Sequence, residues 1–458
     1  MLVLWLPFIG DYHNQGLSNI TTTFGSNVTF DASGKIGKCL SASAASNNTV
    51  TVTLNELDQF LKNGKKYSIS CWVKPTNNVS SGWVIKLGDN SCGLWWAASE
   101  ARWVWNENDN GKRCANPTIS SDFTNWHHLL ITVDKTTTTS FIARYYVDGS
   151  PAEDYEMRQW DASSQSQPTG NNIVISPWIA RLNDIRIYDE ILQPKQIKEL
   201  SKGLVLHYPL TREQNLLFDD MIAITDENGE KLVEELTSEV IIGEYTSEYE
   251  NDFLKVEYDT SGYNHNGQTT GSLGYSTDTA RYCTSSVFNG TQRIVADALS
   301  GEVQSVSLWF KTTKNKSTVQ CIFGESTSGL CAFIYGGGIV SYFRASTGGT
   351  GSRVLFGDEY IENGWNHLVV IKTGDTTRDV YCNGVKLAPT ANNYYTHATG
   401  FFIGARNSSG TLPFYGYISD VRVYASVLTE QDIKELYHTP VSITNNGTLM
   451  TQGELQEV

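Results

Sequence analysis

Hydrophobic and polar positions alternate with a period of two along much of the chain. In the stretch SISCWVK at 68–74, Ile69, Cys71 and Val73 share one face and the polar or aromatic residues share the other. The stretch SVSLWFK at 305–311 repeats this pattern. Such alternation is typical of an antiparallel strand with one buried face. Asn-Gly, Asp-Gly and Gly-Asp pairs recur between these runs, so they predict hairpins between the strands.

Helices are predicted only as short closing elements. One begins at Pro194, and the other is opened by Thr429, which has Asp432 three residues later in a capping-box spacing. Near the end of the chain, two alternating runs at 441–444 and 448–451 flank Asn446-Gly447. This arrangement predicts a C-terminal hairpin.

The chain repeats itself with a period of roughly 237 residues, the sign of two copies of one design. The matching segments are 66–75 with 304–312, 125–134 with 364–375, and 182–200 with 418–436. The openings LVLWLPF at 2–8 and LVLHYPL at 204–210 also match, but their offset is only 202, which indicates an insertion in the second copy. We therefore predict domains at 1–202 and 203–437, an insertion at 213–256 within the second, and a hairpin tail at 438–458.

The repeated motifs resemble the concanavalin A-like, laminin-G-like (LamG) jelly-roll family. They are S-x-S-x-W-x-K, then W-x-H-L, an Asn-Gly or Asp-Gly turn, and D-[IV]-R-[IV]-Y before a short helix ending in I-K-E-L. The second copy is the closer match, because DTSGYNHNG at 259–267 and SVFNGTQ at 286–292 also look like the family's opening segments. The resemblance implies an all-β chain of two concanavalin A-like antiparallel β-sandwiches (jelly rolls). It does not by itself imply an enzyme, because a fold does not fix a function.

The formal charge of -15 is concentrated in one segment. Residues 213–255 contain thirteen Asp or Glu and two Lys, and the rest of the chain is nearly neutral. This balance disfavours nucleic-acid binding, which draws on Lys and Arg. No run approaches the length of a membrane span, and the apolar start lacks the basic region of a secretion signal, so we expect neither membrane insertion nor a signal peptide. Eight cysteines without CxxC spacing favour free buried thiols in a chain folded in a reducing cytoplasm.

The stretch GLWWAASEARWVW at 93–105 holds four tryptophans, and two interpretations stay open. Alternating aromatic residues usually fill a sandwich core, but ten of the twelve tryptophans lie in the first copy, so the shared core does not require them. An exposed platform that stacks on sugar rings is the other interpretation. The carbohydrate-binding candidates are Trp95, Trp96, Trp103, Trp105, Asp89, Asn90, Arg102, Asn106, Tyr335 and Tyr342. The tryptophans that do recur, Trp72 with Trp309 and Trp126 with Trp365, are interpreted as packing.

No catalytic site or metal site is predicted. The paired carboxylate spacing of glucanases with this fold does not occur, and neither does a nucleophile elbow, a P-loop or a zinc motif. His128 and His367, at equal places in the two copies, are interpreted as buried structural histidines. Asp184 and Asp420 are expected to hold a turn or pair with a nearby Arg. The family resemblance allows calcium through Asp259 and Asn264, or through Asp89 and Asn90, but no cofactor is predicted.

Tandem LamG-like domains followed by the tail SITNNGTLMTQGEL resemble minor structural proteins of tailed bacteriophages. The first hypothesis is a phage virion protein, in a fibre, spike or surface decoration, that binds host cell-surface carbohydrate. It would be made in the host cytoplasm, assemble as a homo-oligomer and contact other virion proteins. The alternative is a purely structural virion subunit that binds no glycan. A glycan-degrading enzyme is a third reading, which needs a carboxylate pair that the spacing hides.

Overall fold

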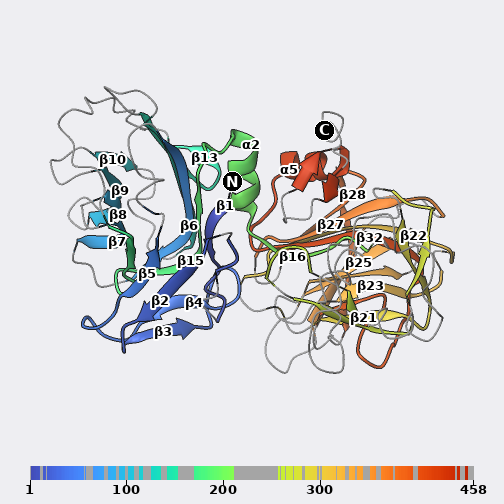
Figure 1. Ribbon diagram of the computed structural model, residues 1–458. Helices are drawn as coiled ribbons and strands as arrows, with labels where there is room; N and C mark the ends of the chain where they lie inside the picture. The colour runs from blue at the N-terminus through green and yellow to red at the C-terminus, as the bar shows by residue number, and fades with distance from the viewer. Residues whose placement is uncertain are drawn as a thin grey trace, which may run out of the picture. The chain divides into compact units, whose positions relative to one another are not determined.

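The chain folds as two compact units in the computed structural model (Figure 1). Unit 1 comprises residues 1–203 with 300–302, and unit 2 comprises residues 204–299 with 303–458. The structure describes residues 2–10, 14–16, 18–55, 57, 65–76, 81–88, 92–97, 102–107, 113–116, 125–135, 142–152, 170–210, 256–257, 259–263, 265–271, 273–280, 284–296, 299, 302–315, 317–324, 330–335, 338–343, 351–356, 363–374, 377–395, 401–438, 441–443 and 449–451. Apart from Val256, the predicted insertion at 213–256 lies outside them.

The described part of unit 1 consists mainly of strands, followed by a closing helix. Its strands are β1 (Leu2–Leu6), β2 (Ile20–Phe24), β3 (Val28–Asp31), β4 (Cys39–Ala42), β5 (Val50–Leu54), β6 (Lys66–Pro75), β7 (Gly82–Leu87), β8 (Cys92–Ala97), β9 (Arg102–Glu107), β10 (Arg113–Asn116), β11 (His127–Asp134), β12 (Ile142–Val147), β13 (Ser150–Pro151), β14 (Asn172–Ile175) and β15 (Ala180–Tyr188). The helix is α2 (Pro194–Lys202). An eight-stranded sheet runs β13-β12-β11-β6-β15-β4-β3 with β1 beside β15, and a seven-stranded sheet runs β10-β9-β8-β7-β14-β5-β2.

Unit 2 repeats this plan. Its strands are β16 (Leu204–Tyr208), β17 (Val256–Glu257), β18 (Gly267–Thr270), β19 (Gly274–Ser276), β20 (Ser285–Asn289), β21 (Arg293–Ala296), β22 (Ser305–Thr312), β23 (Gln320–Gly324), β24 (Cys331–Tyr335), β25 (Gly338–Phe343), β26 (Gly351–Phe356), β27 (Asn366–Lys372), β28 (Arg378–Cys382), β29 (Val385–Lys386), β30 (Pro389–Tyr395), β31 (Phe401–Ile403), β32 (Tyr415–Tyr424), β33 (Val441–Ile443) and β34 (Leu449–Thr451). Helix α5 spans Glu430–His438.

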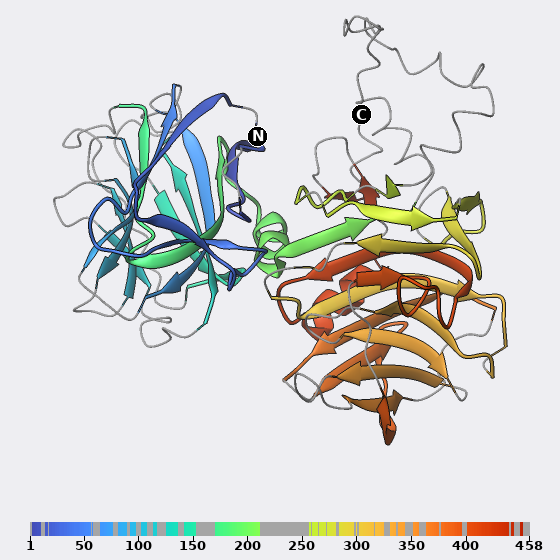
Figure 2. The same cartoon turned by 90° about the horizontal axis from the view of Figure 1, so that it is seen from below.

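Antiparallel pairing in two layers confirms the predicted all-β sandwiches. In unit 2 an eight-stranded sheet, β19-β20-β32-β22-β27-β28-β29 with β16 beside β32, accompanies a nine-stranded sheet, β17-β18-β21-β31-β23-β24-β25-β26-β30. Figure 2 shows strands of unit 2, coloured yellow to red, running side by side. Strands β33 and β34 pair antiparallel, as predicted for the C-terminal hairpin, and the Asn446-Gly447 pair between them lies outside the described residues.

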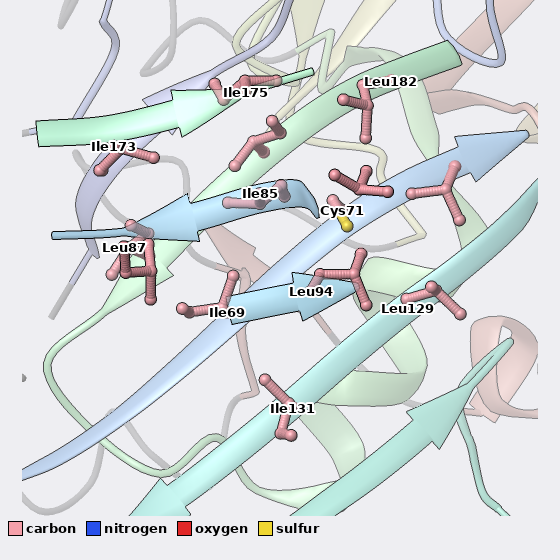
Figure 3. Close-up of a cluster of buried hydrophobic side chains, with 14 of the residues drawn as sticks. Ile69, Cys71, Ile85, Leu87, Leu94, Leu129, Ile131, Ile173, Ile175 and Leu182 are labelled. Atoms are coloured by element: carbon pink, nitrogen blue, oxygen red, sulfur yellow. The ribbon is translucent and has the colours of Figure 1, made fainter. Parts of the chain in front are cut away.

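The inward-facing positions of the two sheets of unit 1 form one core. Figure 3 shows side chains such as Ile69, Cys71 and Leu129 of the eight-stranded sheet beside Ile85 and Leu94 of the seven-stranded sheet. Each of these residues is at most 3 % exposed. Apolar and polar residues alternate along these strands because every second side chain points into the core, away from water.

The closing helices cover part of the outer face of each eight-stranded sheet. In unit 1, Ile197 of α2 packs with Leu130 of β11 and Tyr146 of β12. In unit 2, Ile433 and Leu436 of α5 pack in the same way against β27, β28 and the end of β32. The Thr429 hydroxyl and backbone N–H both donate to the Asp432 carboxylate, so the predicted capping box is confirmed.

A buried aspartate in the left-handed conformation occupies the same bulge in both units. Asp184 has φ 53° and Asp420 has φ 54°. The Asp420 carboxylate accepts from both Arg422 Nε, at 2.7 Å, and His207 Nε2, at 3.0 Å. In unit 1 the carboxylate of Asp184 instead takes an indole N–H, because Trp5 stands where unit 2 has His207. The expected pairing of both aspartates with a nearby Arg is confirmed.

The two recurring histidines are buried, as expected. His128 Nε2 lies 2.7 Å from Ser70 Oγ, and His367 Nε2 lies 2.9 Å from Ser307 Oγ. Burial lowers the pKa of His128 to about 4, against smaller opposing effects of nearby aspartates. His128 is therefore neutral at pH 7, and a neutral imidazole suits a purely structural place in the sheet.

Candidate functional site

Neighbouring tryptophans on β8 face opposite sides of the seven-stranded sheet. Trp96 pairs across the strands with Trp103 of β9, and their ring centroids are 4.8 Å apart. Trp95 pairs with Val104 on one side and with Trp83 of β7 on the other. Because successive residues of a strand alternate in direction, the inward ring of Trp96 requires an outward ring at Trp95.

Three of the predicted platform residues belong to the core. Trp96 is 1 % exposed, Trp103 0 % and Trp105 2 %, and all three pack in the buried cluster of unit 1. A ring that stacks on a ligand must present a face to solvent, so the predicted binding role is wrong for these residues. Among the described residues, none accepts a hydrogen bond from the indole N–H of Trp103 or Trp105, so both rings contribute to the core through packing.

Trp95 and Trp83 form the aromatic centre of an outer face. Their ring centroids are 5.1 Å apart at an interplanar angle of 83°, an edge-to-face pair, and both rings are partly exposed. A β-bulge between Trp83 and Ile85 breaks the alternation of β7, so Trp83 points outward although Ile85, two residues later, points into the core. Sequence reasoning missed Trp83; the signal was its place in the strand that precedes Trp95.

A continuous row of residues extends this face across the sheet. Lys86, Val174 and Thr51 stand opposite one another on β7, β14 and β5, and Gly93 and Thr23 continue the row onto β8 and β2. Four strand spacings of about 4.8 Å give this row a length of about 19 Å. We call the surface formed by Trp83, Trp95, Lys86, Val174 and Thr51 the tryptophan face.

The tryptophan face combines flat apolar rings with hydrogen-bonding groups. Beside the row, Thr53 Oγ1 donates to the Asn172 side-chain oxygen at 2.8 Å, which fixes the amide and leaves its N–H₂ group as a donor. Thr51 and Lys86 are half-buried, so they are held in place yet reach solvent. On the far side of Trp95, Val104 is fully buried, so the accessible part of the face runs from β8 toward β2.

Gly93 keeps the floor of this face flat next to Trp95. Its φ is 137°, a conformation that side chains rarely adopt, and a Cβ there would meet the backbone oxygen of Ile85 at 2.0 Å. No side chain therefore stands between Lys86 and β9 at this point of the row.

The equivalent surface of unit 2 is closed. Register places Cys321 and Phe333 where unit 1 has Trp83 and Trp95, and both are buried with Cys331 in a small cluster. Leu412 packs on that cluster from the loop between β31 and β32, residues 404–414. The loop at this place in unit 1, between β14 and β15, is only residues 176–179. With this shorter loop, Trp83 and Trp95 stay partly exposed.

The remaining predicted binding residues differ in what the structure describes of them; the backbone of Arg102 and Asn106 stands opposite Ala97 and Gly93, on the strand next to Trp95. Tyr335 packs, partly buried, against the closed cluster of unit 2. Asp89 and Asn90 lie outside the described residues. The backbone of the other three is described but their side chains are not: Arg102 and Asn106 in β9, and Tyr342 in β25.

Asp259, the first residue proposed for calcium, is occupied by hydrogen bonds. Its Oδ1 accepts from the backbone N–H of His207 and Ser261, and its Oδ2 accepts from the Ser261 hydroxyl and the His265 N–H, all within 3.0 Å. Asn264, the other residue that the resemblance allows as a calcium ligand, lies outside the described residues. In the part of the chain that the structure covers, no group of three or more His, Cys, Asp or Glu is placed to hold a metal. Neither described helix has the length and apolar character needed to cross a bilayer.

Comparison with known proteins found one matching family model. It is described as the concanavalin A-like lectin/glucanases superfamily, and it matches residues 46–198 and 288–434, about two thirds of the chain. A search of the curated proteins found no match.

Three solved structures illustrate the similarity. Domain 4 of AbnA, a GH43 extracellular arabinanase from Geobacillus stearothermophilus in complex with arabinotriose, is 22 % identical, with 42 % of this chain and 95 % of that chain covered and a TM-score of 0.28. The botulinum neurotoxin serotype G binding domain is 12 % identical, with 83 % and 88 % covered and a TM-score of 0.35. The binding domain of Paraclostridial Mosquitocidal Protein 1 is 15 % identical, with 85 % and 92 % covered and a TM-score of 0.35. These TM-scores are low, so family membership follows from the family model.

Proposed function

The chain belongs to the concanavalin A-like lectin/glucanases superfamily, and from this premise we propose that unit 1 binds carbohydrate on its tryptophan face. The observation that carries the proposal is the partly exposed Trp83–Trp95 pair on the outer side of a sheet whose core needs neither ring. An aromatic face stacks on the C–H groups of a sugar ring. Thr51, Lys86 and Asn172 supply donors and acceptors for its hydroxyls.

Two features favour this surface over its counterpart in unit 2. Its length of about 19 Å suits a short oligosaccharide better than a single sugar. Its apolar and polar groups also lie in separate places, rings at β7 and β8 and hydroxyls toward β5 and β2, which fixes the direction in which a saccharide would lie. The matched surface in unit 2 offers buried thiols and a phenyl ring instead.

The test is binding of the labelled full-length chain to a broad glycan array. We expect saturable binding that the double substitution Trp83→Ala, Trp95→Ala weakens at least about tenfold for one class of glycan, because two stacking rings are lost. Tyr335→Ala, which removes an aromatic side chain from the corresponding sheet of unit 2, is the matched control and should leave that binding unchanged.

Other outcomes of the array separate the alternatives. If the wild-type chain binds no glycan, the purely structural subunit is the better reading. If the double variant binds the same glycans as tightly as the wild type, the tryptophan face is not the site. We propose binding without cleavage, so mass spectrometry of the bound glycans should find no shortened products; their appearance would favour the enzyme hypothesis.

The biological setting is proposed from sequence resemblance. We propose that the chain is a virion protein of a tailed phage, where several copies on one particle would raise the avidity of weak single sites. Mass spectrometry of gradient-purified particles of the virus that encodes it should then find peptides from both units at a fixed ratio to the other virion proteins. Peptides found only in the soluble lysate would contradict this placement.

A further inference from the structure

Unit 2 carries its own exposed aromatic pair, on the other sheet. Tyr417, near the start of β32, stands opposite Lys311 of β22, and Trp365 immediately precedes β27. The ring centroids of Trp365 and Tyr417 are 6.3 Å apart at 40°, and both rings are partly exposed. Helix α5 packs on the same sheet face, where its Tyr437 stacks on Trp309, two residues before Lys311, while Trp365 and Tyr417 stay partly exposed.

A carboxylate and an ammonium group are fixed beside these rings. Asp278 Oδ1 accepts from Trp365 Nε1 at 2.8 Å, and its Oδ2 accepts from Lys311 Nζ at 2.5 Å. The same ammonium group lies 5.8 Å from the ring centroid of Tyr417. The Asp278 side chain is 40 % exposed, so its oxygens keep lone pairs directed to solvent. The hydrogen bonds from Lys311 and then Trp365 lower the pKa of Asp278, which keeps it ionised.

The shared fold does not require this arrangement. In unit 1 the register position of Tyr417 is held by Arg181, which stands opposite Lys74 and forms an ion pair with Asp31 at 2.7 Å. Trp126, the counterpart of Trp365, is 6 % exposed. The recurring tryptophan was interpreted as packing in both copies; in unit 2 the partly exposed ring departs from that interpretation.

We propose that Trp365, Tyr417, Asp278 and Lys311 form a second saccharide site, which binds a neutral pyranose with two adjacent hydroxyl groups. The C–H face of the sugar stacks against the two rings. One hydroxyl donates to the Asp278 carboxylate while its neighbour accepts from Lys311, because the carboxylate and the ammonium group offer acceptor and donor side by side. The two opposite charges compensate each other, so a charged sugar gains no net attraction.

This site goes beyond the proposed function, because it lies in unit 2 and on its eight-stranded sheet, whereas the tryptophan face lies on the seven-stranded sheet of unit 1. It would make one chain bivalent for carbohydrate. Two sites on one chain bind a glycan-coated surface more tightly than either alone, provided both can engage together.

The test uses the full-length chain with Trp83→Ala and Trp95→Ala, so that the tryptophan face cannot contribute. Saturation-transfer NMR with methyl glycosides of glucose, galactose, mannose and xylose is expected to give signals on the ring protons of at least one of them. Adding Tyr417→Ala or Asp278→Asn should weaken that signal at least about tenfold, whereas the control Tyr335→Ala should not.

No saturation transfer to any of the four glycosides would overturn the proposal, and so would a signal that both substitutions leave intact. Near-ultraviolet circular dichroism checks folding; if Tyr417→Ala disturbs it, Asp278→Asn decides alone, since it changes almost no volume. Because the tryptophan face is absent in this background, the outcome is independent of whether the array supports that face.

Discussion

Replacing Trp103 by alanine is expected to lower the free energy of unfolding of unit 1 by about 3–5 kcal/mol. Its ring is fully buried, packs on Trp96, and belongs to the core between the two sheets. Truncation removes the transfer free energy of the indole and leaves a cavity that a sandwich core cannot close. Ten of the twelve tryptophans lie in unit 1, so urea unfolding followed by tryptophan fluorescence reports mainly on this unit.

Trp95→Ala is the matched control, because it removes the same side chain from the next strand over but from the outer face. Because the Trp95 ring is partly exposed, its truncation removes less buried apolar area than truncation of Trp103. We therefore expect a clearly smaller destabilisation. Equal losses for the two variants would mean that Trp95 is as much a core residue as Trp103, and would remove the basis for the tryptophan face.

Acidification from pH 7 to pH 4 is expected to remove about 3 kcal/mol of stability from unit 1 through His128 alone. Burial lowers its pKa to about 4 in the folded chain, against an ordinary value of 6.5. Between these values the unfolded chain takes up a proton that the folded chain does not. The contribution is therefore fully present above pH 6.5 and is lost as pH falls toward 4.

The substitution His128→Gln isolates this effect, since an amide can still hydrogen-bond to Ser70 but does not titrate. Urea unfolding at pH 7 and pH 4 should show that the wild type loses about 3 kcal/mol more than the variant over this interval. If both proteins lose the same amount, His128 is already protonated in the folded state or is reached by water.

Much of the fold could be predicted from local patterns. The alternation around Cys71 reflects one buried sheet face, the spacing of Thr429 and Asp432 gives a real cap, and the two runs near the end of the chain pair as antiparallel strands. These features are local, since each depends on residues a few positions apart, and the internal repeat supplied the rest by showing each pattern twice.

The site was harder to predict, because both faces of β8 carry bulky apolar side chains. Trp95 and Trp96 are chemically identical neighbours, and only the pairing of β8 with the rest of the sheet decides which one is buried. The β-bulge after Trp83 changes which residues of β7 face outward, and no residue in the stretch GWVIKL predicts this bulge. Whether such a surface is covered depends on a loop that is distant in sequence. In unit 2, Leu412 of the loop between β31 and β32 packs on the corresponding surface.

The alternation on β8 has a consequence for how this protein can change over generations. Positions 83, 86, 95 and 174 face outward, while the residues between them hold the sandwich together. If the tryptophan face binds carbohydrate as proposed, substitutions on the outward set would alter what it binds with little loss of core packing. Selection could then act on recognition and on folding almost separately, and the same four positions are where a directed library for new recognition should be placed.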